Sequence, residues 1–213
     1  MKGLSYSFKY GFGESDHATF VALDTTSAFV GRRHLAQQET VAATLRDEGD
    51  AGSDGIPRWV FVFGHHSYRS SGSHGAVEPR TRVGALYDLA ADHADLIMTG
   101  HDHHLEFFLP VGGERAAFVV SGSGGRRRAV KRRHAEGSTD LSENYGFFEV
   151  IVSRDHLQVQ PIEVLPLEAV AREGGGAPIC QEVEPRVRER RAWCRKRSHK
   201  LWNDGPCDPK VFR

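Results

Sequence analysis

Histidines that follow a glycine at the end of an apolar run are the residues of this 213-residue chain best suited to chemistry. Within Asp95–His104, an apolar run ends at Gly100, and His101 and His103 follow two positions apart. Residues i and i+2 of an extended segment point to the same side, so the two imidazoles would project together. Neutral imidazole is a common metal ligand, and this spacing therefore predicts a metal site.

A second segment repeats this pattern earlier in the chain. Trp59–Phe63 is an apolar run of β-prone residues, and Gly64, His65 and His66 follow it directly. Between the two segments, Arg80–His93 carries apolar residues at helical spacing. A strand–helix–strand unit places both histidine loops at one edge of a parallel sheet, which is where open α/β sheets bind ligands.

The remaining pattern predicts an α/β fold with mixed sheets. Further strands are expected at residues 5–9, 19–23, 105–109, 116–121, 145–152 and 156–164, and a further helix at residues 35–48. Gly122–Glu143 is expected to be a long loop in which Arg126–Arg133 forms an exposed basic run. Glu173–Pro178 is expected to be a linker, and Arg186–Lys200 a basic helical tail.

The formal charge of the chain is zero, but its distribution is uneven. From Gln181 to the C-terminus there are ten Lys or Arg against five Asp or Glu. No stretch approaches the ~18 apolar residues of a transmembrane helix, and the first residues lack the apolar region of a signal peptide. Three cysteines, Cys180, Cys194 and Cys207, match neither a zinc nor a redox spacing. No membrane partner is expected, and the cellular compartment is left open.

These motifs carry a resemblance to a known family. The segments 64–66, 71–75 and 100–103 resemble the last two signature blocks of calcineurin-like metallophosphoesterases, and most of all the purple (tartrate-resistant) acid phosphatase branch. The resemblance extends over roughly residues 4–165. It implies part of a four-layer α/β/β/α sandwich with mixed sheets, in which residues 1–166 form the C-terminal part of the catalytic domain. Residues 167–213 would then be a linker and a basic tail.

The resemblance also implies roles for individual residues. His65 and His101 correspond to ligands of one divalent metal ion, and His103 to a ligand of a second ion. His74 corresponds to a histidine that binds the substrate phosphate or protonates the leaving group. Asp102 lies between two of the ligands and could orient one of them through its other ring nitrogen.

Other positions either depart from the family pattern or have no role in it. Ser67 stands where the family usually has proline, a residue that stiffens the loop. His66 and His104 match no family role, and both are expected to be partly buried polar residues.

The carboxylate-bearing blocks of the family are not found in this sequence. An Asp-x-His, a Gly-Asp pair and a Gly-Asn-His would supply a bridging carboxylate and further ligands, and none matches here. The chain is therefore expected to represent the second half of a catalytic domain, with the missing N-terminal half as a possible partner. The intact family site holds two ions of Fe, Zn or Mn, whereas three imidazoles here would hold one at most.

The function expected from these residues is hydrolysis of a phosphate monoester at a dinuclear metal site, with weak activity for this chain alone. A phosphodiesterase of the same superfamily is one alternative. A non-catalytic protein that grips nucleic acid or an acidic partner through the basic loop and tail is another. Nucleic acid is the less favoured partner, because no aromatic residues are interleaved with the arginines for base stacking.

Overall fold

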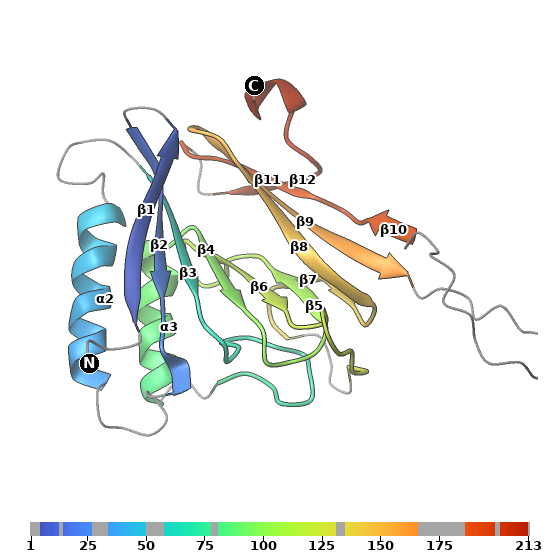
Figure 1. Ribbon diagram of the computed structural model, residues 1–213, viewed down its shortest axis with the longest axis horizontal. Coiled ribbons are helices and arrows are strands. Elements are labelled where there is room, and N and C mark those ends of the chain that lie inside the picture. Colours follow the sequence, from blue (N-terminus) through green and yellow to red (C-terminus); the bar gives the residue numbers. More distant parts are fainter. Residues whose placement is uncertain are drawn as a thin grey trace, which may run out of the picture.

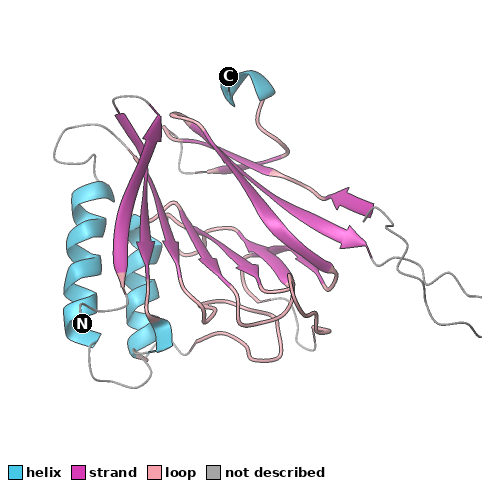
Figure 2. Cartoon of the chain, viewed as in Figure 1, coloured by secondary structure: helices cyan, strands magenta, loops and turns pink. Residues whose placement is uncertain are grey.

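The structure is a computed structural model, which describes residues 5–12, 15–26, 34–49, 58–77, 81–130, 135–165, 186–198 and 201–212. These residues form two β-sheets, with helices packed against the outer face of the larger sheet (Figures 1 and 2). The described part thus contains a helix layer and two sheet layers, and a second helix layer is not among these residues. It is a mixed α/β fold, as the sequence predicts.

The larger sheet has a parallel centre and antiparallel edges. Its strands lie in the order β1-β2-β3-β4-β6-β5-β7, and β2, β3, β4 and β6 run parallel to one another. The parallel strands therefore end at the same edge of the sheet. The strands are β1 (Tyr6–Phe12), β2 (Ser15–Ala22), β3 (Trp59–Phe63), β4 (Leu96–Thr99), β5 (Leu105–Phe108), β6 (Ala117–Ser121) and β7 (Ser138–Ser142).

Two helices of the described chain, α2 (His34–Gly49) and α3 (Arg82–His93), cover one face of this sheet. The backbone N–H of Gly84 donates to the side chain of Thr81, which caps the start of α3. Valines and leucines of both helices pack against the sheet face, and buried Tyr87 lies among them. The expected strand–helix–strand unit is therefore confirmed.

The smaller sheet is built around one long strand, β9 (His156–Leu165). On one side β9 pairs along its length with β8 (Tyr145–Val152). Its other side is shared by β10 (Arg186–Glu189) and β11 (Trp193–Lys196), and β12 (Trp202–Asp204) pairs with β11. A short 3₁₀ helix, η1 (Pro209–Phe212), follows.

The expectation of a helical tail over Arg186–Lys200 is wrong, because this segment supplies β10 and β11. The open side of β9 offers unpaired backbone groups, and pairing satisfies them. The alternation of strand side chains also buries Trp193 and Arg195 on one face of β11, and Trp193 stacks on Phe107 of the larger sheet at 4.1 Å between ring centroids.

Buried Asp95, at the start of β4, joins the two sheets. Its carboxylate accepts hydrogen bonds from the Val60 N–H at 2.8 Å and from Arg115 at 3.0 Å. Arg195 of β11 forms an ion pair with the same carboxylate at 3.1 Å and is itself buried. Each charge thus has partners, which is the condition for burying an ion pair.

A disulfide links Cys194 to Cys207, although the cysteine spacing alone did not indicate one. Cys180 and the expected linker Glu173–Pro178 lie outside the described residues, as does part of the basic run Arg126–Arg133. The described helices include none that is long and apolar enough to cross a membrane.

Glu163 of β9 anchors the C-terminal strands through charge. It accepts hydrogen bonds from Arg188 at 2.8 Å and from Arg190 at 2.6 Å, and Arg190 also pairs with Asp140. Burial alone would raise the pKa of Glu163, but hydrogen bonds from Ser142, Arg190 and Arg188 outweigh burial and lower this pKa to about 2.

This lowered pKa predicts acid sensitivity. In Glu163→Gln the free energy of unfolding at pH 7 should fall, because the ionised carboxylate favours the folded state above its unfolded pKa. The difference from the unsubstituted protein should shrink as the pH falls from about 4.5 toward about 2. Urea unfolding at several pH values measures this, with exposed Glu149→Gln as the control. A difference that stays constant with pH would contradict the assignment.

Candidate metal centre

The candidate site lies where the parallel strands end. Thr25 follows β2, His65 and His66 follow β3, and His101 follows β4. The loops after β3 and β4 are joined by backbone hydrogen bonds, from Gly64 N–H to Met98 O and from Gly100 N–H to His65 O, both 3.1 Å. The edge of the sheet therefore holds the two histidine loops in a fixed register.

Close packing beneath the first histidine loop requires a glycine at position 64. A Cβ at this position would lie 2.6 Å from the Tyr87 hydroxyl oxygen and 2.9 Å from the Thr25 methyl carbon. The Tyr87 hydroxyl lies in the space that this Cβ would take, and it donates to the His66 carbonyl oxygen at 2.7 Å. Ser67 donates to the Gly100 carbonyl at 2.9 Å, a bond that the proline usual in the family could not make.

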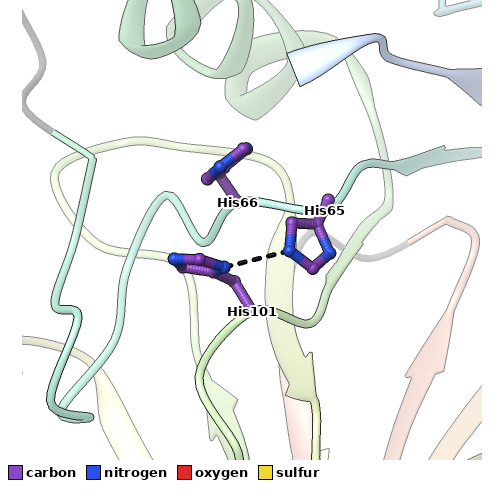
Figure 3. Close-up of side chains that lie close together, drawn as sticks. All are labelled: His65, His66 and His101. Carbon is purple, nitrogen blue, oxygen red and sulfur yellow. Dashed lines mark hydrogen bonds between the residues drawn. The ribbon is translucent and has the colours of Figure 1, made fainter. Parts of the chain in front are cut away.

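Three imidazoles converge at this edge (Figure 3). One ring nitrogen from each of His65, His66 and His101 lies within 4.8 Å of the others. His65 Nε2 and His101 Nδ1 are hydrogen-bonded at 2.9 Å. His101 has a φ of 53°, a left-handed conformation that is uncommon for a residue other than glycine and is often found at functional sites.

His66 is held by the loop after β2. Its Nδ1 is hydrogen-bonded to the Thr25 hydroxyl at 2.8 Å. With Nδ1 bonded in this way, Nε2 is the nitrogen that can coordinate a metal without breaking the contact. A partner on the second ring nitrogen is typical of metal-binding histidines, because it fixes the ring orientation and the tautomer.

The cluster favours neutral imidazoles, the form that binds metal ions. Burial lowers the pKa of His66, and the neighbouring His101 and His65 lower it further. Burial also lowers the pKa of His101, with His74 and His65 acting in the same direction. Protons therefore compete less strongly with a metal here than at an ordinary histidine.

The residues fit a single metal ion. Zn–N bonds of ~2.0–2.1 Å place tetrahedral nitrogen ligands ~3.3 Å apart. The 2.9 Å contact and the 4.8 Å limit bracket this spacing, so small side-chain movements suffice. Three imidazoles are a donor set that suits Zn, Fe and other transition metals. Within the part of the chain that the structure describes, the group contains no carboxylate.

His103 lies beside the cluster rather than within it. Its ring centroid is 6.5 Å from that of His74, and the His74 ring is 4.4 Å from that of His101. His103 Nδ1 is buried and has no hydrogen-bond partner among the described residues. A buried nitrogen without a partner is an unfavourable arrangement that a ligand or an ion would relieve.

His74 contacts a basic segment as well as the cluster. Its Nε2 is 2.9 Å from Nη1 of Arg128. The guanidinium can only donate, so His74 Nε2 accepts this bond and a neutral ring carries its proton on Nδ1. His74 is exposed, and it therefore faces the solvent side of the site.

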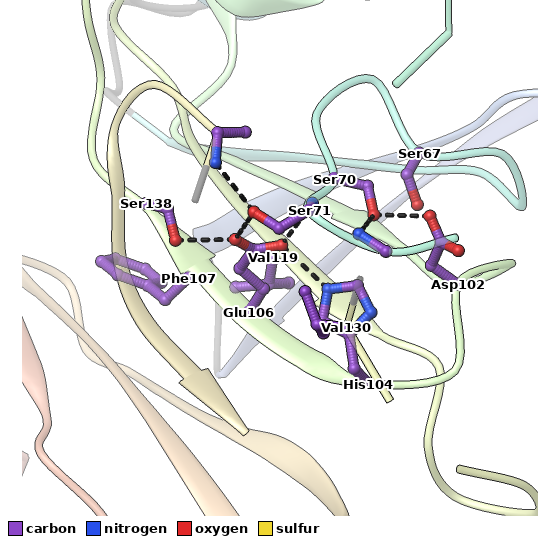
Figure 4. Close-up of polar contacts among 12 residues, drawn as sticks. Ser67, Ser70, Ser71, Asp102, His104, Glu106, Phe107, Val119, Val130 and Ser138 are labelled. Atoms are coloured by element: carbon purple, nitrogen blue, oxygen red, sulfur yellow. Dashed lines mark hydrogen bonds and ion pairs between the residues drawn. The ribbon is translucent and has the colours of Figure 1, made fainter. Parts of the chain in front are cut away.

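Asp102 supports the loop that carries His74. Its buried carboxylate accepts the backbone N–H of His74 at 2.8 Å and the N–H of Gly75 at 3.1 Å. It also accepts the hydroxyl of Ser70 at 2.5 Å (Figure 4). A Cβ at Gly72 would lie 2.4 Å from the Asp102 carboxyl carbon, so this glycine permits the approach. These contacts position His74, and the contacts described for Asp102 include no histidine ring nitrogen.

A second buried carboxylate, that of Glu106, fixes the same loop from below. Glu106 accepts the Ser71 N–H at 2.9 Å, the Ser71 and Ser138 hydroxyls at 2.6 Å each, and contacts His104 Nε2 at 2.8 Å. Burial would raise the pKa of Glu106, but the bonds from His104, Ser138 and Ser71 lower it overall. His104 is fully buried, and its contact with Glu106 has a structural role.

Sequence reasoning and structure agree on part of this arrangement. His65 and His101 meet as their spacing suggests, with His74 nearby and His103 displaced. The sequence analysis assigns no site role to His66, which completes the cluster. Thr25 could have indicated this role, because its hydroxyl lies at the end of the neighbouring parallel strand, at the edge where open α/β sheets bind ligands.

A metal titration tests which histidine completes the site. Zn²⁺ affinity should fall on the order of 100-fold in His65→Ala, His66→Ala and His101→Ala, and roughly tenfold in Thr25→Val, because ligands and their orienting partners are lost. His156→Ala, in the other sheet, is the control. Isothermal titration calorimetry measures the affinities. If His103→Ala weakens binding and His66→Ala does not, His103 is the third ligand.

The support of the His74 loop is tested separately. Asp102→Asn would point an NH₂ group at one of the backbone or hydroxyl donors, so we expect a loss of about 1–3 kcal/mol in the free energy of unfolding. Hydrogen exchange of residues 72–76 should increase at the same time. Exposed Asp92→Asn in α3 is the control. Unchanged exchange in this loop would show that other contacts hold it.

The sequence is similar to curated phosphatases over part of its length, although no family model matches it. Purple acid phosphatase 3 of Arabidopsis thaliana is 30% identical over 129 residues, covering 59% of this chain and 34% of that protein. Purple acid phosphatase 17 of the same plant is 35% identical over 86 residues, covering 40% and 25%. The chain thus spans between a quarter and about a third of the length of these relatives.

Two solved structures share the fold. The structure titled "GAP50 the anchor in the inner membrane complex of Plasmodium" matches with a TM-score of 0.59 and 18% identity, covering 76% of this chain and 51% of that one. PhoD matches with a TM-score of 0.56 and 12% identity, covering 95% and 44%. At such low identity these likenesses concern the fold alone. The sequence matches relate this part of the chain to the purple acid phosphatases, and the two solved structures share its fold.

Proposed function

We propose that this chain carries the histidine-bearing part of a metal-dependent phosphoric ester hydrolase. The observation that carries the proposal is the convergence of His65, His66 and His101 at the carboxyl edge of the parallel strands. Sequence similarity to purple acid phosphatases supports it. These relatives are named as phosphatases, and phosphate esters are the corresponding substrate class for this chain.

The histidines and their neighbours would have different roles in this function. His65, His66 and His101 would hold a divalent ion, with Thr25 orienting His66. When bound, such an ion supplies Lewis-acid polarisation of the phosphoryl group and eases the ionisation of water. His103, with its unpaired Nδ1, would serve a second ion, as the family resemblance implies.

His74 would act on the substrate rather than on the metal. It is exposed, lies 4.4 Å from the His101 ring between centroids, and is held in place from below by Asp102. A phosphate bound at the cluster would meet both His74 and Arg128. His74 would then donate a hydrogen bond to a phosphate oxygen or a proton to the leaving group.

A monoester is the favoured substrate, because the segment 71–75 resembles that of the acid phosphatases, which act on monoesters. A diester is the alternative substrate, and the comparison of a monoester with a diester described below distinguishes the two. We expect the activity of this chain alone to lie below the ~1–10³ s⁻¹ typical of enzymes. Three imidazoles suit one ion, whereas the family mechanism places two ions at the phosphate.

Hydrolysis of p-nitrophenyl phosphate and bis(p-nitrophenyl) phosphate tests the proposal. With Zn²⁺, Mn²⁺ or Fe²⁺ supplied, we expect slow release of p-nitrophenol from the monoester and less from the diester. His101→Ala should abolish the metal-dependent part, because it removes a ligand, while His156→Ala retains it. Metal-dependent turnover that survives in His101→Ala would place the active centre elsewhere in the chain.

A further inference from the structure

A basic segment follows β6, the parallel strand next to β4, and so emerges at the same edge as the histidine cluster. We call Arg126–Arg128 the arginine arm. Its start is fixed by Gly122, whose N–H donates to the His104 carbonyl at 3.1 Å. A Cβ at Gly122 would lie 1.9 Å from the Asp102 carbonyl oxygen, so only glycine fits this approach.

Backbone contacts then hold the arm against the site. The Arg128 N–H donates to the His103 carbonyl at 2.8 Å, and the Val130 N–H donates to a Glu143 carboxylate oxygen at 2.5 Å. The Arg128 side chain reaches His74. The arm is therefore part of the rim of the candidate centre.

The charge of the arm is left largely unneutralised. Arg126 and Arg127 are exposed, and Arg127 lies over the Tyr145 ring at 5.5 Å. Among the described residues, no carboxylate forms an ion pair with any of the three arginines. The arm also acts on the site electrostatically, because Arg128 and Arg126, after burial, lower the pKa of His103.

A single phosphate at the cluster would contact His74 and Arg128, which leaves the two exposed guanidinium groups without an anion. Guanidinium groups bind phosphate oxygens through pairs of parallel, charge-assisted hydrogen bonds, so the two exposed arginines are suited to a further phosphoryl group. We propose that the arginine arm binds a second phosphoryl group of the substrate. The substrate class is thus a phosphate ester with at least two phosphoryl groups. This inference rests on the proposed function.

Binding of AMP and ADP tests the inference, because these probes differ by one phosphoryl group. Titrations of the Zn²⁺-loaded full chain at fixed ionic strength should give roughly tenfold tighter binding of ADP than of AMP. In the double variant Arg126→Gln/Arg127→Gln this advantage should disappear, with a much smaller loss of affinity for AMP than for ADP. Arg154→Gln, an exposed arginine in the β8–β9 turn, is the matched control. Arg128 is left intact, because it contacts His74.

An ADP-to-AMP affinity ratio that is the same in the double variant as in the unsubstituted chain would overturn the inference. So would binding of a uridine oligonucleotide more tightly than ADP with the same dependence on the arm, which would assign the arm to nucleic acid. AMP binding that is insensitive to His101→Ala contradicts the proposed function instead. If neither nucleotide binds, both are overturned.

Discussion

The hydrogen bonds that continue the β3–β4 pairing past the ends of the strands are the constraint on which the site depends. Gly64 and Gly100 each donate a backbone N–H across the junction, one to Met98 and one to His65. Parallel pairing aligns the two loops without any contribution from their side chains. The 2.9 Å contact between His65 and His101 is thus a consequence of sheet geometry. Such preorganisation reduces the free energy spent on ordering ligands.

Two buried carboxylates position the loop that carries His74, which the strand pairing does not reach. Asp102 and Glu106 bind the backbone and serine hydroxyls of the segment 70–75 and do not contact the His74 ring. Each is almost fully buried, which is tolerable because several donors satisfy it. His74 is therefore presented on a loop that owes its shape to charges the solvent does not reach. In this arrangement, the acidic residues near the candidate metal centre position its loops.

The sequence predicts the strand–helix–strand unit and the meeting of His65 and His101, because apolar periodicity and strand-end glycines are local signals. It predicts His103 rather than His66 as the third member, because the choice depends on where the β2 loop brings Thr25. The prediction of a helix over Arg186–Lys200 also fails, since basic residues with scattered apolar residues among them suit a helix as well as a strand. The open side of β9 decides this case, and that side exists only in the folded chain.

The contacts of β11 with the larger sheet limit where the chain can be truncated. Arg195 neutralises Asp95 at the root of β4, the strand that ends in the histidine loop, and β10 and β11 close the free side of β9. A chain shortened after β9 would leave a carboxylate buried with less compensation and a strand edge open to other chains. The last strands thus belong to the fold as much as the motifs do, and a recombinant fragment chosen only by motif similarity would omit them.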